Sequence, residues 1–169
     1  MDFLITQIIG AIGYSTLALS YFRKDKKKIL FMQIIAYIFF IVHYYMLSGL
    51  TGSICNIVGL FAMVIIYLFD KYKIKKKSLL IFITIPLLAV ILIYTYENIY
   101  SIFPIIASTI VIISFLTDNE GLIRGIGVVA AICWLIYAIV YKSYVAIVFE
   151  IITLISVFVA FIKNNKAKK

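Results

Sequence analysis

The chain has 169 residues, of which 65% are hydrophobic and only 14% are charged, with a net charge of +9. This composition excludes a water-soluble globular protein, because such domains are less than half apolar and carry nearly twice as many charges. The basic balance by itself would suit a nucleic-acid-binding protein, but the positions of the basic residues argue against one.

Seven apolar stretches fill almost the whole chain and predict seven transmembrane α-helices, since about 20 apolar residues cross the ~30 Å hydrocarbon core. In chain order, the predicted spans are 4–22, 29–47, 53–69, 78–96, 99–116, 123–141 and 144–162. The short connections leave no water-soluble domain and make consecutive helices antiparallel neighbours. The first span is expected to be retained, because Met1-Asp2-Phe3 lacks the basic region of a signal peptide.

The basic residues lie on one side of the predicted bundle. All sixteen except Lys142 fall after the first, third and fifth spans, at the start of the sixth, or in the C-terminal tail. They are Arg23, Lys24, Lys26, Lys27, Lys28, Lys71, Lys73, Lys75, Lys76, Lys77, Arg124, Lys163, Lys166, Lys168 and Lys169. The positive-inside rule then places the N-terminus outside and the C-terminus in the cytoplasm. Anionic lipid headgroups are the expected partners of the lysine runs, and a nucleic acid is not expected.

No enzyme or metal site is predicted. Cys55 and Cys133 lie within spans and have no second Cys or His at ligand spacing, so neither a metal, a cofactor nor a disulfide is expected. The sequence has no Ser-His-Asp set, no carboxylate pair on one helix and no nucleotide-binding glycine pattern. One His and one buried acid are too few for most hydrolytic chemistry.

A shift of 94 positions superimposes the first three spans on the last three without a gap. Under this shift Ser20 meets Ser114 and Ala36 meets Ala130. The fourth span is left as a linker, so both three-helix units have the same orientation, as in a parallel repeat. The predicted organisation is a first bundle over residues 1–70, a linker helix with a basic loop over 71–98, and a second bundle with a basic tail over 99–169.

This pattern resembles the SWEET and PQ-loop (MtN3-like) superfamily, whose members join two three-helix bundles by one helix. The chain is most similar to the YgjV family of bacterial inner-membrane proteins, over nearly its whole length. The matching segments are His43-Tyr44-Tyr45-Met46-Leu47, Gly52-Ser53-Ile54-Cys55-Asn56, Pro104, Cys133-Trp134-Leu135-Ile136 and Glu150. The segment from Cys133 to Ile147 also resembles the second repeat of plant SWEETs, in which a Trp and an Asn face the sugar. The Pro-Gln dipeptide is absent, and Glu150 or Phe149 stands where the second Asn would be. The resemblance implies a multi-pass protein of the bacterial inner membrane.

Glu150 and Asn56 are the first candidate pair for a solute site. Glu150 is the only acid well inside a span, and an ionisable side chain at bilayer depth normally faces the bundle interior. The 94-residue shift places Asn56 at the equivalent position. The pair would then flank the axis between the two bundles and bind a polar solute. The structural alternative is a hydrogen bond between them that only locks the bundle.

Aromatic residues supply the second group of candidates. Trp134 and Tyr137 lie one turn apart, and Phe40 is the shift partner of Trp134. Such rings could sandwich a sugar or a flat heterocycle across the axis. The alternative for the aromatic residues is anchoring at the membrane surface. That alternative is the one we expect for Tyr44, Tyr45, Tyr96, Tyr100, Tyr141 and Tyr144.

Proton coupling and gating supply the remaining candidates. His43 and Glu150 could carry protons, His43 because histidine titrates near neutral pH. A lone His near a helix end could equally be a hydrogen-bonded structural group. Pro104 is the gating candidate, because a proline frees a carbonyl and bends a helix; a static kink is the alternative.

The sequence thus predicts an all-α transporter that moves a small polar solute by alternating access between its two bundles. A non-transporting membrane receptor or accessory subunit of the same fold is the alternative. Since one chain contains both bundles, a monomer would suffice, and a homodimer is compatible with the sequence.

Overall fold

The computed structural model describes residues 2–20, 26–74, 79–116 and 120–166, with side chains described within 2–20, 27–74, 80–114 and 128–155. This part of the chain is all-helical, which confirms the predicted class. Its elements are α1 (Phe3–Ser20), α2 (Lys26–Met46), α3 (Leu50–Lys71), α4 (Leu79–Thr95), the 3-10 helix η1 (Ile99–Ser101), α5 (Ile102–Leu116), α6 (Glu120–Val140) and α7 (Tyr144–Lys166). Each predicted span corresponds to one α-helix, with ends that differ by a few residues.

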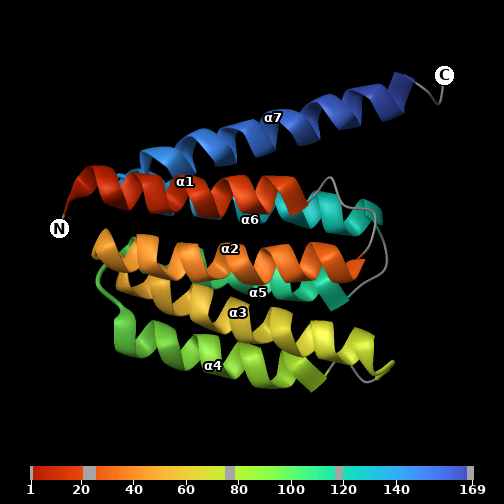
Figure 1. The fold of residues 1–169 in the computed structure, drawn as a ribbon, viewed down its shortest axis with the longest axis horizontal. Coiled ribbons are helices and arrows are strands. Elements are labelled where there is room, and N and C mark those ends of the chain that lie inside the picture. Colours follow the sequence, from red (N-terminus) through yellow and green to blue (C-terminus); the bar gives the residue numbers. More distant parts are fainter. Residues whose placement is uncertain (1, 21–25, 75–78, 117–119, 167–169) are drawn as a thin grey trace.

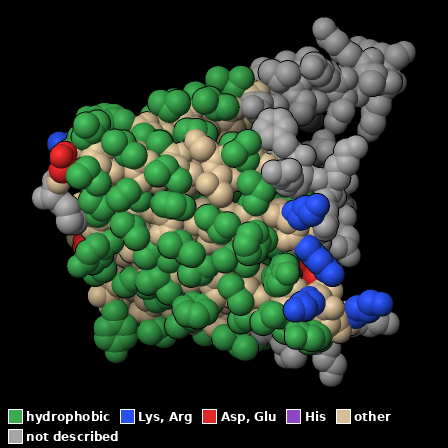
Figure 2. Space-filling view, viewed as in Figure 1, with side chains coloured by type: hydrophobic (Ala, Val, Ile, Leu, Met, Phe, Trp, Pro, Cys, Tyr) green, Lys and Arg blue, Asp and Glu red, His purple; other side chains and the backbone are tan. Residues whose placement is uncertain are grey.

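The helices suit a membrane rather than water. Within the described residues, α1, α2 and α3 are long and apolar enough to cross a bilayer, and the other four α-helices contain shorter apolar segments. Figure 2 shows hydrophobic side chains over most of the visible face. Such a surface is stable against hydrocarbon and would aggregate in water.

The helices run antiparallel, side by side (Figure 1). In one set, α2 contacts both α1 and α3; in the other, α6 contacts both α5 and α7. The two sets meet where α3 packs on α5 and where α1 packs on α7, while α4 packs on α3 and α5. A buried apolar cluster spans the two sets and is made of Tyr14, Ala36, Phe40, Ala138 and Ala146.

The two ends of the bundle differ in charge. The turn end carries the N-terminus, the α2–α3 turn with Ser48 and the α6–α7 turn with Lys142 (Figure 1). The lysine end carries Lys27, Lys28, Lys71 and Lys73, and basic side chains gather there in Figure 2. The other predicted basic residues lie outside the described side chains: Arg23, Lys24, Lys26, Lys75, Lys76, Lys77, Arg124, Lys163, Lys166, Lys168 and Lys169.

Candidate functional site

One face of α1 is built to receive a side chain from α2. Thr6, Gly10, Gly13 and Tyr14 are all buried, and their spacing of three and four residues places them on one helical stripe. A Cβ at Gly10 would lie 2.7 Å from Cε1 of His43, so only glycine leaves room for the imidazole there. The glycine at position 10 of α1 therefore allows the His43 side chain to pack against that helix.

His43 is fully buried and bonds both α1 and the α6–α7 turn. Its Nδ1 lies 2.7 Å from the Thr6 carbonyl oxygen, and its Nε2 lies 2.6 Å from Oγ of Ser143. Because a carbonyl only accepts, Nδ1 carries the proton, and a neutral ring accepts the Ser143 hydroxyl at Nε2. His43 thereby connects α2 to α1 and to the residue that precedes α7.

Tyr137 occupies the corresponding place on α6. It is fully buried, and its hydroxyl oxygen accepts the Gly52 backbone N–H at 2.9 Å. A Cβ at Gly52 would lie 2.4 Å from the Tyr137 ring, and one at Gly49 would lie 2.9 Å from its hydroxyl. The two glycines thus open the start of α3 to a side chain from α6.

A second group, which we call the tyrosine–glutamate cluster, consists of Tyr14, Tyr44 and Glu150. The hydroxyl oxygens of Tyr14 and Tyr44 lie 3.5 Å apart, in hydrogen-bond contact. The carboxyl group of half-buried Glu150 interacts electrostatically with both tyrosines. The cluster joins α1, α2 and α7 and can present two hydroxyls and a carboxyl to a polar molecule.

Aromatic rings enclose this cluster. The Trp134 ring stacks on Tyr44 with centroids 5.4 Å apart, and the Phe40 ring lies 4.6 Å from that of Tyr14. Phe149, next to Glu150, stacks on Tyr14 at 5.3 Å. Trp134 and Phe40 therefore each cover one tyrosine, rather than forming the direct pair that repeat equivalence suggested.

Asn56 is placed differently from Glu150. It is buried, and its Nδ2 donates to the Gly52 carbonyl oxygen of its own helix at 2.8 Å. In the part of the chain that is described, Glu150 instead interacts with Tyr14 and Tyr44. Among the described residues, the Nδ2 hydrogen bond of Asn56 therefore stays within α3, and an Asn56–Glu150 hydrogen bond remains a prediction.

Pro104 is fully buried in the first turn of α5. The N–H groups of a first helical turn have no partner within the α-helix, so a proline there removes no such bond. The bend that we expected from a freed carbonyl does not follow from this position. Pro86, by contrast, lies inside α4.

The structure thus brings most of the predicted residues to one region. His43, Phe40, Trp134, Tyr137 and Glu150 all lie at or beside the tyrosine–glutamate cluster. Tyr44, which we expected at the membrane surface, is 1% exposed and central to the group. That expectation was wrong because it used only distance from the helix end. Helical spacing would have found Tyr44, which lies one turn from Phe40 and therefore on the same face.

Tyr14 was missed by the sequence analysis. The signal available for it was its place on the Thr6–Gly10–Gly13 stripe of α1. The two pockets described at the surface lie elsewhere, one lined by Tyr45, Met46, Ser48 and Leu50 and the other by Lys27, Lys28, Phe31, Met32 and Tyr67. Tyr14 and Tyr44 are 5% and 1% exposed, so their rings are closely packed in this conformation.

Comparison with known families agrees with the membrane character of the fold. The family model Imp-YgjV, described as bacterial inner membrane protein, matches residues 4–168. Comparison with curated proteins finds no match, and neither does comparison with solved structures. Because the family model covers nearly the whole chain, the protein belongs to the YgjV family of bacterial inner membrane proteins.

Proposed function

We propose that the protein transports a small polar solute across the bacterial inner membrane, and that the solute binds at the tyrosine–glutamate cluster. The observation that carries the proposal is the half-buried Glu150 carboxyl, which interacts electrostatically with Tyr14 and Tyr44, whose hydroxyl oxygens lie 3.5 Å apart between α1 and α2. A carboxyl group at membrane depth is costly, and such groups usually mark solute or proton pathways. Two tyrosines and Trp134 supply the polar atoms and flat faces that a sugar or heterocycle requires.

The proposal includes two parallel three-helix units joined by α4. Three pairs of helix contacts support it. A shift of 94 residues carries α1–α2 onto α5–α6 and α2–α3 onto α6–α7, and exchanging the two units carries the α3–α5 contact onto the α7–α1 contact. Side chains follow the same rule: His43 reaches the start of α7, and Tyr137, its shift partner, reaches the start of α3. Two equivalent units around a shared axis form the arrangement in which rocking alternates access.

In the proposed orientation the turn end faces outward and the lysine end faces the cytoplasm, following the positive-inside rule. Contacts between the units close the turn end. His43 bonds Ser143, Tyr137 bonds Gly52, and Gln7 on α1 accepts the Val145 N–H at the start of α7 at 3.2 Å. Opening toward the outside would have to break these bonds. The conformation described is therefore proposed to be closed outward, with a single chain as the transporting unit and no catalytic activity.

Solute binding can be tested by thermal stabilisation of the detergent-purified protein against sugars, nucleosides, vitamins and amino acids. A ligand at 100 times its Kd stabilises the folded protein by about 2.7 kcal/mol. Tyr44→Phe and Glu150→Gln should abolish the shift that the hit compound causes. Tyr45→Phe is the matched control, because Tyr45 is the adjacent tyrosine and is exposed; it should keep the shift.

Uptake of the hit compound into proteoliposomes then separates transport from reception. Uptake that is lost in Glu150→Gln and kept in Tyr45→Phe supports a transporter. Binding without uptake would favour the receptor or accessory subunit. Equal binding by wild type and by both cluster variants would show that the cluster is structural.

A further inference from the structure

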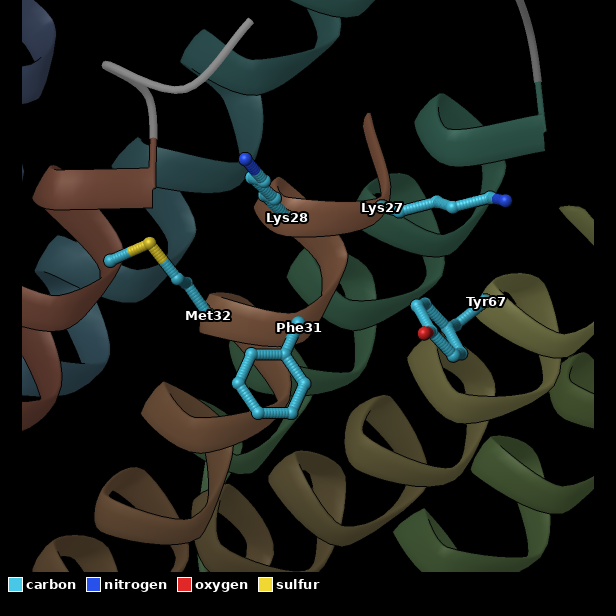
Figure 3. Close-up of a pocket in the computed structure, with 5 residues that line it drawn as sticks. All are labelled: Lys27, Lys28, Phe31, Met32 and Tyr67. Carbon is cyan, nitrogen blue, oxygen red and sulfur yellow. The ribbon is translucent and has the colours of Figure 1, made fainter. Parts of the chain in front are cut away.

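A groove at the lysine end combines lysines with apolar side chains, and it lies outside the proposed solute site. It is open to the surface, has a volume of about 460 Å³, and is lined by Lys27, Lys28, Phe31 and Met32 of α2 and by Tyr67 of α3. Figure 3 shows Lys27 extending above the Tyr67 ring, with the Phe31 ring deeper along α2. The groove lies well away from the tyrosine–glutamate cluster, near the opposite end of α2.

Charge and apolar surface are layered along the helix in this groove. Lys27 and Phe31 are four residues apart, as are Lys28 and Met32, so each pair lies on one face of α2. At 1.5 Å per residue, the apolar side chains begin about 6 Å below the lysines. Figure 3 shows the Lys27 and Lys28 side chains extending to different sides of α2, Lys27 on the side of Tyr67 and Lys28 on the side of Met32, with apolar side chains beneath each.

We propose that this groove binds one anionic phospholipid, with its headgroup lying across the start of α2 between Lys27 and Lys28 and the start of an acyl chain against Phe31. Phe31 is 57% exposed on a chain whose surroundings are hydrocarbon, so an acyl chain is its natural neighbour. A soluble anion could use the lysines but would gain nothing from Phe31 and Met32. The layering therefore favours a molecule that is charged at one end and apolar below.

The charge around the groove agrees with an anionic headgroup. Lys71 and Lys73 follow Tyr67 on the same side of the protein, and Arg23, Lys24 and Lys26 precede Lys27 in the sequence. Among the described side chains, Asp70 is the acid at this end. Basic pockets between helices on the cytoplasmic side are known to bind such headgroups.

The test is lipid binding to the whole protein, measured by native mass spectrometry from detergent with added phosphatidylglycerol or phosphatidylcholine. Each lysine near an anionic surface contributes roughly fivefold in affinity, so Lys27→Gln/Lys28→Gln should weaken phosphatidylglycerol binding about thirtyfold. Lys71→Gln/Lys73→Gln, a matched pair at the same end, should weaken it less, because neither side chain lines the groove. Equal losses in both pairs would mean diffuse surface attraction and would overturn the proposal.

Two further measurements exclude the remaining explanations. Lys27→Arg/Lys28→Arg should bind phosphatidylglycerol like wild type, which shows that charge rather than a local fold defect is being tested. Inorganic phosphate should not displace the lipid at millimolar concentration. Displacement by phosphate, or equal affinity of wild type for phosphatidylcholine, would show that the groove is no phospholipid site.

Discussion

At the turn end, a hydrogen bond with another helix takes the place of an N-cap side chain. The N-cap of α3 is Gly49, which has no side chain to accept from the first-turn N–H groups. The Tyr137 hydroxyl oxygen, from a helix in the other set, accepts the Gly52 N–H instead. A first-turn donor of α3 is thus satisfied by tertiary contact, and this ties the start of the helix to α6.

Tyr137→Phe should lower the free energy of unfolding by about 1–3 kcal/mol, because it leaves the buried Gly52 N–H without its acceptor while keeping the ring. Unfolding in mixed micelles would measure this. Tyr45→Phe removes an exposed hydroxyl and should change stability by less than about 0.5 kcal/mol. Equal stability of both variants would show that water reaches the Gly52 amide.

Much of this residue-scale chemistry was visible in the sequence. An apolar chain with one interior acid and one histidine points to Glu150 and His43, because desolvated polar groups need partners. Tyr14 and Tyr44 were not found, because distance from the helix end was used for Tyr44 in place of helical spacing. The spacing places Tyr44 one turn from Phe40 and Tyr14 on the Thr6–Gly10–Gly13 stripe.

At the scale of the element, the α2–α3 and α6–α7 turns are the same structure. Ser48 and Lys142 both have positive φ, 61° and 54°, and they are 94 residues apart. In each turn the following N–H reaches back to close a six-residue loop, Gly49 to the Tyr44 carbonyl and Ser143 to the Ala138 carbonyl, both at 2.9 Å. These are Schellman motifs built on residues other than glycine.

Ser48→Gly and Lys142→Gly should each stabilise the protein, by about 0.5–1 kcal/mol, because glycine adopts positive φ without the Cβ strain. Thermal unfolding in detergent would measure the gain. Ser15→Gly is the control: Ser15 is exposed inside α1, where glycine should instead cost about 0.5 kcal/mol. Stabilisation of one turn and not the other would argue against equivalent units.

The first turn of α5 shows how much an element's boundary matters. The sequence favoured Pro104 as the residue that bends a span, while its place in the first helical turn costs no α-helical bond. Composition predicts the ends of a helix only to within a few residues. A proline in the first turn leaves the helix straight, whereas a proline a few residues later bends it, so this uncertainty decides the prediction. Gating by Pro104 remains a prediction, now without a kink to support it.

At the scale of the whole molecule, charge distribution bears on orientation. The described lysines Lys27, Lys28, Lys71 and Lys73 lie at one end and Lys142 at the other. We expect the lysine end in the cytoplasm, because short basic loops are retained there.

Single-cysteine labelling in intact cells tests this orientation, in a background where buried Cys55 and Cys133 are replaced by Ala. Ser48→Cys should react with an impermeant reagent from outside, and Lys73→Cys should react only after lysis; both positions are exposed. Gly49 would be a poor site, since any side chain there meets the Tyr137 hydroxyl. Labelling of both cysteines from outside is incompatible with an odd number of spans between them.

Proton coupling is a second prediction at this scale. If Glu150 is protonated in one conformation and ionised in the other, uptake into liposomes should rise with an imposed pH gradient, and Glu150→Gln should remove that dependence while retaining some uptake. His43→Gln separates the two candidates. Rates that are the same with and without the gradient in every variant would make the protein a passive facilitator.

The sequence by itself determined that the protein lies in a membrane, that it is all-helical and how many helices it has. The reason is that a helix must be apolar over a length set by the thickness of the bilayer. It also determined the family and the acid and histidine that need partners. Only the tertiary structure decided that Asn56 bonds its own helix while Glu150 interacts electrostatically with Tyr14 and Tyr44. On a helix that is apolar all round, periodicity carries little information about the inward face. That face is chosen by close packing, here by where Gly10 and Gly52 leave room for His43 and Tyr137.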